Sequence, residues 1–360
     1  MMWVMGHELS PEQQALVHMP ASERVWLSGP AGAGKTTTAV RRLGALLTQG
    51  VAADQILVLV PQRTLGLPYY GAIRHPQAAD GGVVDVLTPG GLAKRMVALF
   101  WPLAAEAAGF QNPDRPPTFL TLETAQYFMA RIVRPLMQEE HYFDSVTLER
   151  NRIYGQVLDN LNKASVAGFS HTEVGQRLAA AWIGEESQLN VYRDVQECVN
   201  RFRAYCLAHN LLDFSLQLEV FSNQLWPHPN CREHLLQRYR HLMVDNAEEF
   251  TPQDHDLLCE WLPKVDSAFV LHDDDAGYRL FLGADPRQAQ TLKQACERQE
   301  TLSASFVASP GIEALEKQLC HVLERPSPAS AHGDPRDALC FEYKRYHPQM
   351  IDWVANRWRT

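Results

Sequence analysis

The sequence predicts an α/β fold built on a parallel sheet, and three observations lead to this prediction. An apolar run at residues 25–27 leads into a glycine-rich loop and then into a helical pattern from Ala39. Continuous apolar runs follow at residues 55–60, 240–244 and 267–272, of the kind that parallel sheets bury on both faces. A long block with helical spacing separates the first of these runs from the other two. We therefore expect a helix-covered sheet with an inserted helical subdomain.

Composition limits where the protein works and what it binds. The 360 residues carry a formal net charge of -9, so any nucleic-acid contact requires a local basic groove. The seven cysteines are odd in number and include no C-x-x-C pair, which indicates reduced thiols. The first residues lack a basic signal region, and the longest apolar stretch, residues 96–110, is too short to cross a bilayer. We expect a cytoplasmic protein without a membrane contact.

The loop after the first apolar run has the spacing G-x-x-x-x-G-K-T, over Gly29–Thr36. In such a P-loop, backbone N–H groups at a helix N-terminus cradle a polyphosphate, and glycine allows the close approach. Lys35 would reach the β- and γ-phosphates, and the Thr36 hydroxyl would bind Mg²⁺. The strand, loop and helix context argues against a chance glycine-rich turn. The predicted nucleotide contacts here are Gly29, Gly32, Gly34, Lys35, Thr36 and Thr37.

A helix is predicted upstream of this loop, over residues 9–17. Ser10 is its N-cap, and Pro11 lies in its first turn. Gln13 carries an amide that offers both a donor and an acceptor to a purine edge, so we predict an adenine contact for it. A solvated helix face is the alternative explanation for this glutamine.

The apolar run at residues 240–244 ends in a carboxylate, Asp245. This is the Walker B arrangement, in which the aspartate holds Mg²⁺ beside the P-loop hydroxyl. The presence of a P-loop and of a Walker B strand in the same chain makes the assignment of Asp245 stronger than either motif alone would. Thr36 and Asp245 are therefore the predicted metal ligands.

Residues 91–209, which separate the two halves of the sheet, read as helices. Apolar residues recur at helical spacing over residues 92–100, 122–134, 152–162, 172–181 and 189–208. Basic side chains in this block would line a track for a nucleic-acid backbone, or else belong to ordinary solvated helix faces. These basic residues are Lys94, Arg95, Arg131, Arg134, Arg150, Arg152, Lys163, Arg201 and Arg203.

Taken in order, the segments resemble the N-terminal half of superfamily 1 DNA helicases of the UvrD/Rep type. The order of seven motifs carries this resemblance, since most of them are individually weak. The similar segments are the Q motif at Leu9–Val17, the P-loop at Gly29–Thr36, the next strand motif at Val58–Thr64, a degenerate TFHS element at Thr88–Leu92, the D-F-x-x-L signature at Leu212–Leu216, the V-D-E-x-Q-D motif at Val244–Glu249 and the G-D-x-D-Q-x-I-Y-x-F-R-G-A-D motif at His272–Asp285.

The resemblance implies a domain organisation. Residues 1–90 and 210–304 would form a RecA-like ATP-binding domain, called 1A in the family, and residues 91–209 its helical 1B-like insertion. Residues 305–360 would begin a second RecA-like domain or form a partly ordered tail. Helical patterns in this last part cover residues 312–323 and 349–358, around a loop at residues 325–336.

The resemblance also implies ATP-driven translocation along single-stranded DNA, with ATP and Mg²⁺ as cofactors. Arg63 and Thr88 fall in family motifs that contact DNA, and Phe281 matches an aromatic residue that stacks on a base. Stacking tolerates any base sequence, which suits a motor. The alternative for Phe281 is a buried core aromatic.

Three positions depart from the family pattern. Asn246 replaces the glutamate that polarises the attacking water, Ala276 replaces a γ-phosphate sensor, and Leu282 replaces an arginine. Because asparagine cannot accept a proton, a literal alignment predicts ATP binding with weak hydrolysis. Glu248 or Glu249 is the candidate substitute base.

Two other function classes remain open. One is a catalytically impaired nucleotide-binding adaptor that holds a protein or DNA partner, or a C-terminal motor half. The other is a small-molecule kinase on the same P-loop, but the arginine-rich lid that it requires is not recognisable after the P-loop helix.

Overall fold

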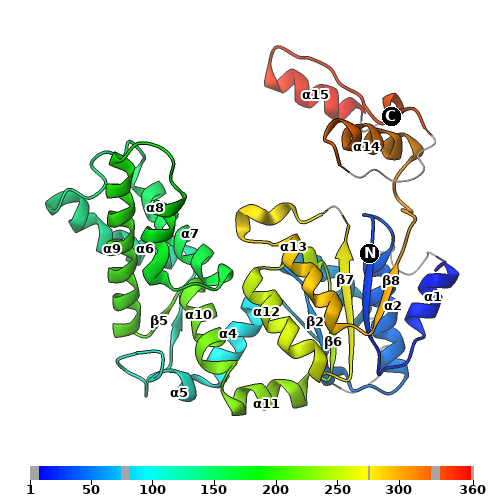
Figure 1. The fold of residues 1–360 in the computed structure, drawn as a ribbon, viewed down its shortest axis with the longest axis horizontal. Coiled ribbons are helices and arrows are strands. Elements are labelled where there is room, and N and C mark those ends of the chain that lie inside the picture. Colours follow the sequence, from blue (N-terminus) through cyan, green and yellow to red (C-terminus); the bar gives the residue numbers. More distant parts are fainter. Residues whose placement is uncertain (1–7, 74–81, 275, 326–332, 358–360) are drawn as a thin grey trace. The chain divides into compact units, whose positions relative to one another are not determined.

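The computed structural model contains a six-stranded sheet, all of its strands parallel, within residues 24–301 (Figure 1). The structure describes residues 8–73, 82–274, 276–325 and 333–357. The strand order is β3-β2-β6-β7-β1-β8. These strands are β1 (Arg24–Gly29), β2 (Ile56–Leu59), β3 (Asp85–Leu87), β6 (His241–Val244), β7 (Ser267–Asp273) and β8 (Arg298–Thr301). The predicted α/β fold, a parallel sheet with an inserted helical block, is confirmed, and its RecA-like identity stays a prediction.

The sheet buries both of its faces, as its apolar strands predict. Along β1, Val25 and Leu27 point into one core, and Trp26 points into the other. The first core is completed by α1 (Pro11–Val17), α2 (Lys35–Thr48) and α3 (Leu67–Ile73). The second is completed by α4 (Pro89–Leu99), α10 (Phe214–Val220), α11 (Pro229–Arg238) and α12 (Pro252–Trp261). Every strand with a continuous apolar run therefore lies inside the sheet.

Strand β8 lies at the edge of the sheet and was not recognised from the sequence. Its residues, Arg298–Thr301, are all polar, and their exposure alternates along the strand. It follows the short helix α13 (Pro286–Ala289) and pairs with β1 through backbone hydrogen bonds. A polar edge strand carries no apolar run, so the pattern that identified the other strands cannot detect it.

The helical block consists of α5 (Trp101–Ala104), α6 (Leu122–Glu139), α7 (Arg150–Ala167), α8 (Val174–Ala181) and α9 (Ser187–Ala208). Helices α6 to α9 gather into one bundle beside the sheet (Figure 1). The chain enters and leaves the bundle of α6 to α9 through two short parallel strands, β4 (Thr118–Phe119) and β5 (Leu211–Leu212). Buried residues of the bundle join one continuous core with the Trp26 face of the sheet. The predicted inserted subdomain thus packs onto that face.

A buried ion-pair network fixes the end of α9 against the start of α10. The Arg203 guanidinium donates to Asp213 Oδ1 at 3.0 Å and to Glu219 Oε1 at 2.7 Å. Asp213 in turn caps α10 by accepting from the backbone N–H of Ser215 and Leu216. Both predictions for Arg203, a solvated helix face and a nucleic-acid contact, are therefore wrong. The other eight basic residues of that set are exposed.

The structure divides into two units, Met1–Ser303 and Ala304–Thr360. The second unit contains α14 (Pro310–Val322) and α15 (His347–Arg357), which match the two predicted helices. Trp358, the last residue of the second predicted helix, lies outside the described residues, and so do residues 326–332 of the predicted loop. The family assignments of the domains stay predictions.

Two further findings concern the helices and the cysteines. No helix within the described ranges has the length and apolar character that a membrane span requires. All seven cysteines are free thiols, as the absence of paired spacing predicts.

We expect Arg203→Met to lower the free energy of unfolding, measured by urea denaturation, by about 3–5 kcal/mol, because Asp213 and Glu219 would lose their cation in a buried site. The matched control is Arg201→Met on the same helix. Arg201 pairs with Glu197 and Glu140 in solvent, so its loss should cost below about 1 kcal/mol. Equal costs for the two variants would contradict this account of the network.

Candidate nucleotide-binding site

The P-loop connects the carboxyl end of β1 to the first turn of α2. Gly34 precedes α2 with φ 81°, in the left-handed region that favours glycine. A side chain at Gly29 would place its Cβ 2.3 Å from the Leu302 carbonyl oxygen, so this position also requires glycine. Thr37 lies half-buried in the first turn of the helix. The loop is therefore shaped by its glycines and aims a helix N-terminus at the sheet edge where α/β proteins bind ligands.

The Lys35 ammonium group is held inside the loop. It donates to the carbonyl oxygens of Gly29 at 2.8 Å and Pro30 at 2.7 Å. It also forms an ion pair with Asp273, the last residue of β7. Because β7 lies next to β1, the end of this strand reaches the P-loop directly. A bound polyphosphate would compete with Asp273 for the same cation.

The Asp245 carboxylate follows β6 and receives side-chain hydrogen bonds on both oxygens. The Thr36 hydroxyl donates to Oδ1 at 3.3 Å, and the Tyr69 hydroxyl donates to Oδ2 at 2.8 Å. Burial raises the pKa of Asp245 to about 6, and the hydrogen bonds from Tyr69 and Thr36 oppose this shift. The structure thus brings together the two predicted metal ligands. Sequence reasoning missed Tyr69, for which the signal was a tyrosine shortly after the carboxyl end of β2.

Thr36 and Asp245 form a donor set that suits Mg²⁺. A hydroxyl and a carboxylate are hard oxygen ligands, and Mg²⁺ in nucleotide sites takes one or two carboxylates together with phosphates and water. Within the described ranges, no group of three or more His, Cys, Asp or Glu side chains would hold a metal alone. The pair therefore fits Mg²⁺ that arrives with a nucleotide.

Glu248 belongs to the same network through the end of β7. Its Oε2 accepts from the Asp273 backbone N–H at 2.9 Å, and its Oε1 accepts from the Asn246 amide at 3.1 Å. The side chain is 1% exposed, and this burial raises the pKa of Glu248 to about 7. Glu248 therefore approaches the residue that pairs with Lys35.

Glu249, the second candidate base, has a different neighbour. Its carboxylate lies 3.7 Å from the Arg279 Nε, in the turn Tyr278–Leu282. The two glutamates thus connect to different parts of the molecule, Glu248 to the P-loop network and Glu249 to the segment that carries Phe281.

Gln13 contacts the P-loop and is not part of a solvated helix face. It is 3% exposed. Its Nε2 donates to the Ala33 carbonyl oxygen at 3.1 Å, and its Oε1 accepts from the Ser10 backbone N–H at 2.9 Å. The solvated alternative is therefore wrong, because the amide closes a capping box and reaches the loop. The adenine contact stays a prediction.

The three predicted DNA contacts occupy different settings. Phe281 is 70% exposed, so the core-aromatic alternative is wrong. Arg63 is exposed in the turn Arg63–Gly66, which follows β2. Thr88 is the N-cap of α4, where its hydroxyl accepts from the Gly91 backbone N–H at 3.0 Å. Thr88 thus has a structural role, and the DNA roles of all three stay predictions.

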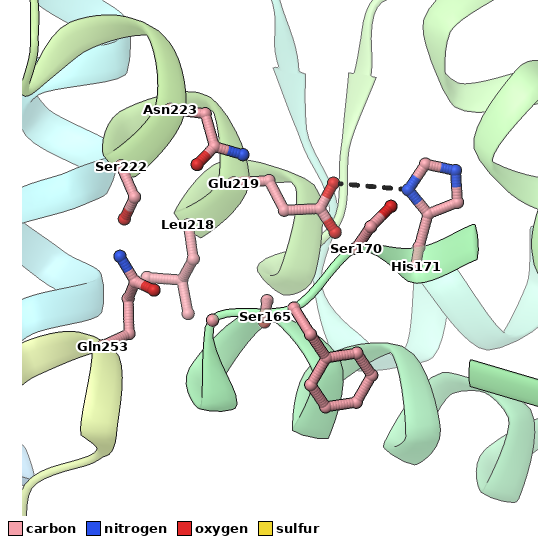
Figure 2. A pocket seen from close by; sticks show the side chains of 10 residues that line it. Ser165, Ser170, His171, Leu218, Glu219, Ser222, Asn223 and Gln253 are labelled. Carbon is pink, nitrogen blue, oxygen red and sulfur yellow. Dashed lines mark ion pairs between the residues drawn. The ribbon is translucent and has the colours of Figure 1, made fainter. Parts of the chain in front are cut away.

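A separate pocket of about 250 Å³ lies where α7 and α10 meet the start of α12. Figure 2 shows His171 and Glu219 facing one another there, with Asn223 and Gln253 farther along the wall. The His171 Nδ1 lies 3.7 Å from the Glu219 Oε2. Asn223 belongs to a π-helical turn, Phe221–Leu225. None of the predicted nucleotide or DNA contacts lines this pocket. The nucleotide site is therefore defined by the P-loop network and not by the pocket.

The chain is distantly similar to known helicases. It is 27% identical over 286 residues to the ATP-dependent DNA helicase UvrD2 of Mycobacterium bovis and to the proteins of that name from two strains of Mycobacterium tuberculosis. The match covers 78% of this chain and 38% of each relative, so the chain spans well under half of their length. This similarity supports a place among helicase-like P-loop proteins.

Two other comparisons add little. No family model matches the chain. A solved structure of the bacterial conjugative coupling protein TrwBdeltaN70, in complex with sulphate, is 10% identical in sequence to this chain. The match covers 89% of this chain and 79% of the TrwBdeltaN70 chain, with a TM-score of 0.27. This score is too low to support an argument.

We expect Glu248 to make stability depend on pH. Its pKa is about 7 in the folded chain and 4.5 ordinarily, so between these values the folded chain binds more protons than the unfolded chain. The free energy of unfolding should therefore fall as pH rises through this window, by about 3 kcal/mol for this group. Calorimetry near both ends of the window should show a smaller loss for Glu248→Gln. An unchanged pH dependence in this variant would contradict the assignment.

Proposed function

We propose that this chain is the nucleotide-binding part of an ATP-driven motor on single-stranded DNA, of the UvrD/Rep type. One observation carries the ATP part of this proposal. Thr36 and Asp245 are 209 residues apart in sequence, and their side chains meet at 3.3 Å beside the P-loop lysine. The distant similarity to UvrD2 helicases supports the nucleic-acid part.

In this proposal, the P-loop residues bind the polyphosphate. Lys35 exchanges its pairing with Asp273 for the β- and γ-phosphates, and the loop N–H groups at the start of α2 take the remaining phosphate oxygens. Thr36 and Asp245 hold Mg²⁺, which neutralises charge on the phosphates when it is bound. Gln13, which lies against the loop, contacts the adenine.

Glu248 is the residue that we propose as general base. A carboxylate with a pKa of about 7 can accept a proton at neutral pH and is well matched to that task. Its hydrogen bond to the Asp273 backbone N–H places it next to the residue that Lys35 would release. Glu248 would thus take over the role of the family glutamate, whose position is occupied by Asn246 in this chain.

The turn Tyr278–Leu282 is the proposed DNA contact. Phe281 presents its ring to solvent, and stacking of a base on an aromatic ring contributes about 1–3 kcal/mol. Arg279 of the same turn pairs with Glu249, adjacent to the proposed base. A DNA base stacked on Phe281 would therefore lie on a turn that is linked to Glu249, the residue next to the proposed general base Glu248. Arg63 would contact a DNA phosphate.

A second function, the adaptor with impaired hydrolysis, is favoured by the backbone at Asn246. This residue has φ 58° and ψ 54°, a left-handed conformation that asparagine adopts more readily than glutamate. The local fold thus suits the residue that departs from the family pattern. In this case the chain would bind nucleotide with weak turnover and hold a protein partner, DNA or a second motor half.

Turnover separates the two functions. For the motor, we expect single-stranded DNA to stimulate ATP hydrolysis, and Glu248→Gln to lower kcat about 10²–10⁴-fold because the base is lost. Glu249→Gln, one residue later, is the matched control and should change kcat far less. ATP that raises the melting temperature without any DNA-stimulated turnover would instead support the adaptor.

Phe281→Ala should weaken binding of a single-stranded oligonucleotide by about 5–150-fold, the equivalent of about 1–3 kcal/mol, because one stacked base is lost. Fluorescence anisotropy with labelled oligothymidine measures this change. Leu280→Ala removes an exposed aliphatic side chain from the same turn and serves as the control. Equal binding by the wild type and Phe281→Ala would exclude the stacking role.

A further inference from the structure

Tyr69 is a buried side chain of the nucleotide site that the proposed mechanism does not use. It lies on α3, and no part of the residue is exposed. Its hydroxyl donates to Asp245 Oδ2 at 2.8 Å, while Thr36 donates to Oδ1 at 3.3 Å. Tyr69 thus contacts the proposed metal ligand on the oxygen that faces away from the P-loop hydroxyl.

We infer that Tyr69 is a positioning residue, which orients the Asp245 carboxylate so that Oδ1 faces Thr36, the residue with which Asp245 would hold Mg²⁺. This inference rests on the ATP site of the proposed function. The carboxylate torsion of aspartate is broad, so the backbone of β6 alone does not set the plane of the carboxylate. A donor on one oxygen sets that plane, and loss of such outer partners typically costs 10–100-fold in metal affinity.

Packing does not account for the Tyr69 hydroxyl. The ring belongs to the core between the sheet and α2, where phenylalanine would fill nearly the same space. The neighbouring Tyr70 provides a comparison within the same helix. Its hydroxyl donates to the Val86 carbonyl oxygen at 2.9 Å, which is a link to the backbone of β3. The two tyrosines therefore form a matched pair, one directed to the site and the other to the scaffold.

Binding of ADP by the full chain tests the inference without turnover. At saturating ADP, MgCl₂ is titrated, and the rise in melting temperature gives the half-maximal Mg²⁺ concentration. Tyr69→Phe should require about 10-fold more MgCl₂ than the wild type. Tyr70→Phe should match the wild type. In EDTA, calorimetry should give the same ADP affinity for all three proteins, because the P-loop is unchanged.

A double variant shows whether Tyr69 acts through Asp245. Asp245→Asn alone should raise the Mg²⁺ requirement, and Tyr69→Phe added to it should raise the requirement no further, because the carboxylate that Tyr69 orients is already gone. Independent, multiplying effects would overturn the positioning role.

The remaining outcomes are also decisive. If the wild type binds Mg²⁺ and ADP together, and Tyr69→Phe has the same Mg²⁺ requirement, the inference is wrong while the nucleotide site stands. A lower melting temperature of Tyr69→Phe with an unchanged requirement means a structural role alone and overturns the inference too. If ADP binding by the wild type does not depend on Mg²⁺, the proposed function fails, and the inference fails with it.

Discussion

The buried carboxylate of Asp245 is the group on which the arrangement of the site depends. A carboxylate that is 2% exposed is stable only if donors surround it. Thr36 brings one donor from the P-loop, and Tyr69 brings another from α3. Hydrogen bonds to this one group therefore join the P-loop, α3 and the end of β6 at a single point.

A second set of contacts joins the nucleotide loop to the acidic segment after β6. Lys35 pairs with Asp273, the backbone N–H of Asp273 binds Glu248, and Glu248 accepts from Asn246. Because the links are consecutive, the proposed replacement of Asp273 by a phosphate at Lys35 would change the surroundings of Glu248. Through Glu249 and Arg279 the acidic segment also reaches the turn that presents Phe281. The proposed coupling of ATP to DNA has a contiguous physical route here.

Much of the fold could be predicted from periodicity, and the failures have physical causes. The apolar runs matched the buried strands, and Ser10 capped its helix as expected. Edge strand β8 is polar and paired through its backbone, so no side-chain pattern marks it. Arg203 looked like a surface residue because charge alone does not reveal that two carboxylates from α10 and its N-cap will surround it. For Gln13 only the solvated-face alternative was wrong, since its partner Ala33 is 20 residues away in sequence.

The sequence by itself determined the strand, glycine loop and helix of the P-loop, the pairing of Thr36 with Asp245 and the parallel sheet. These depend on local spacing and on the rule that parallel strands end at one edge. Only the tertiary structure decided that Tyr69 meets Asp245, that Glu248 joins Asp273 and Glu249 joins Arg279, and that Phe281 lies in solvent. The physical reason is that such contacts depend on how helices and turns pack across the edge of the sheet, and residue spacing carries no record of that packing.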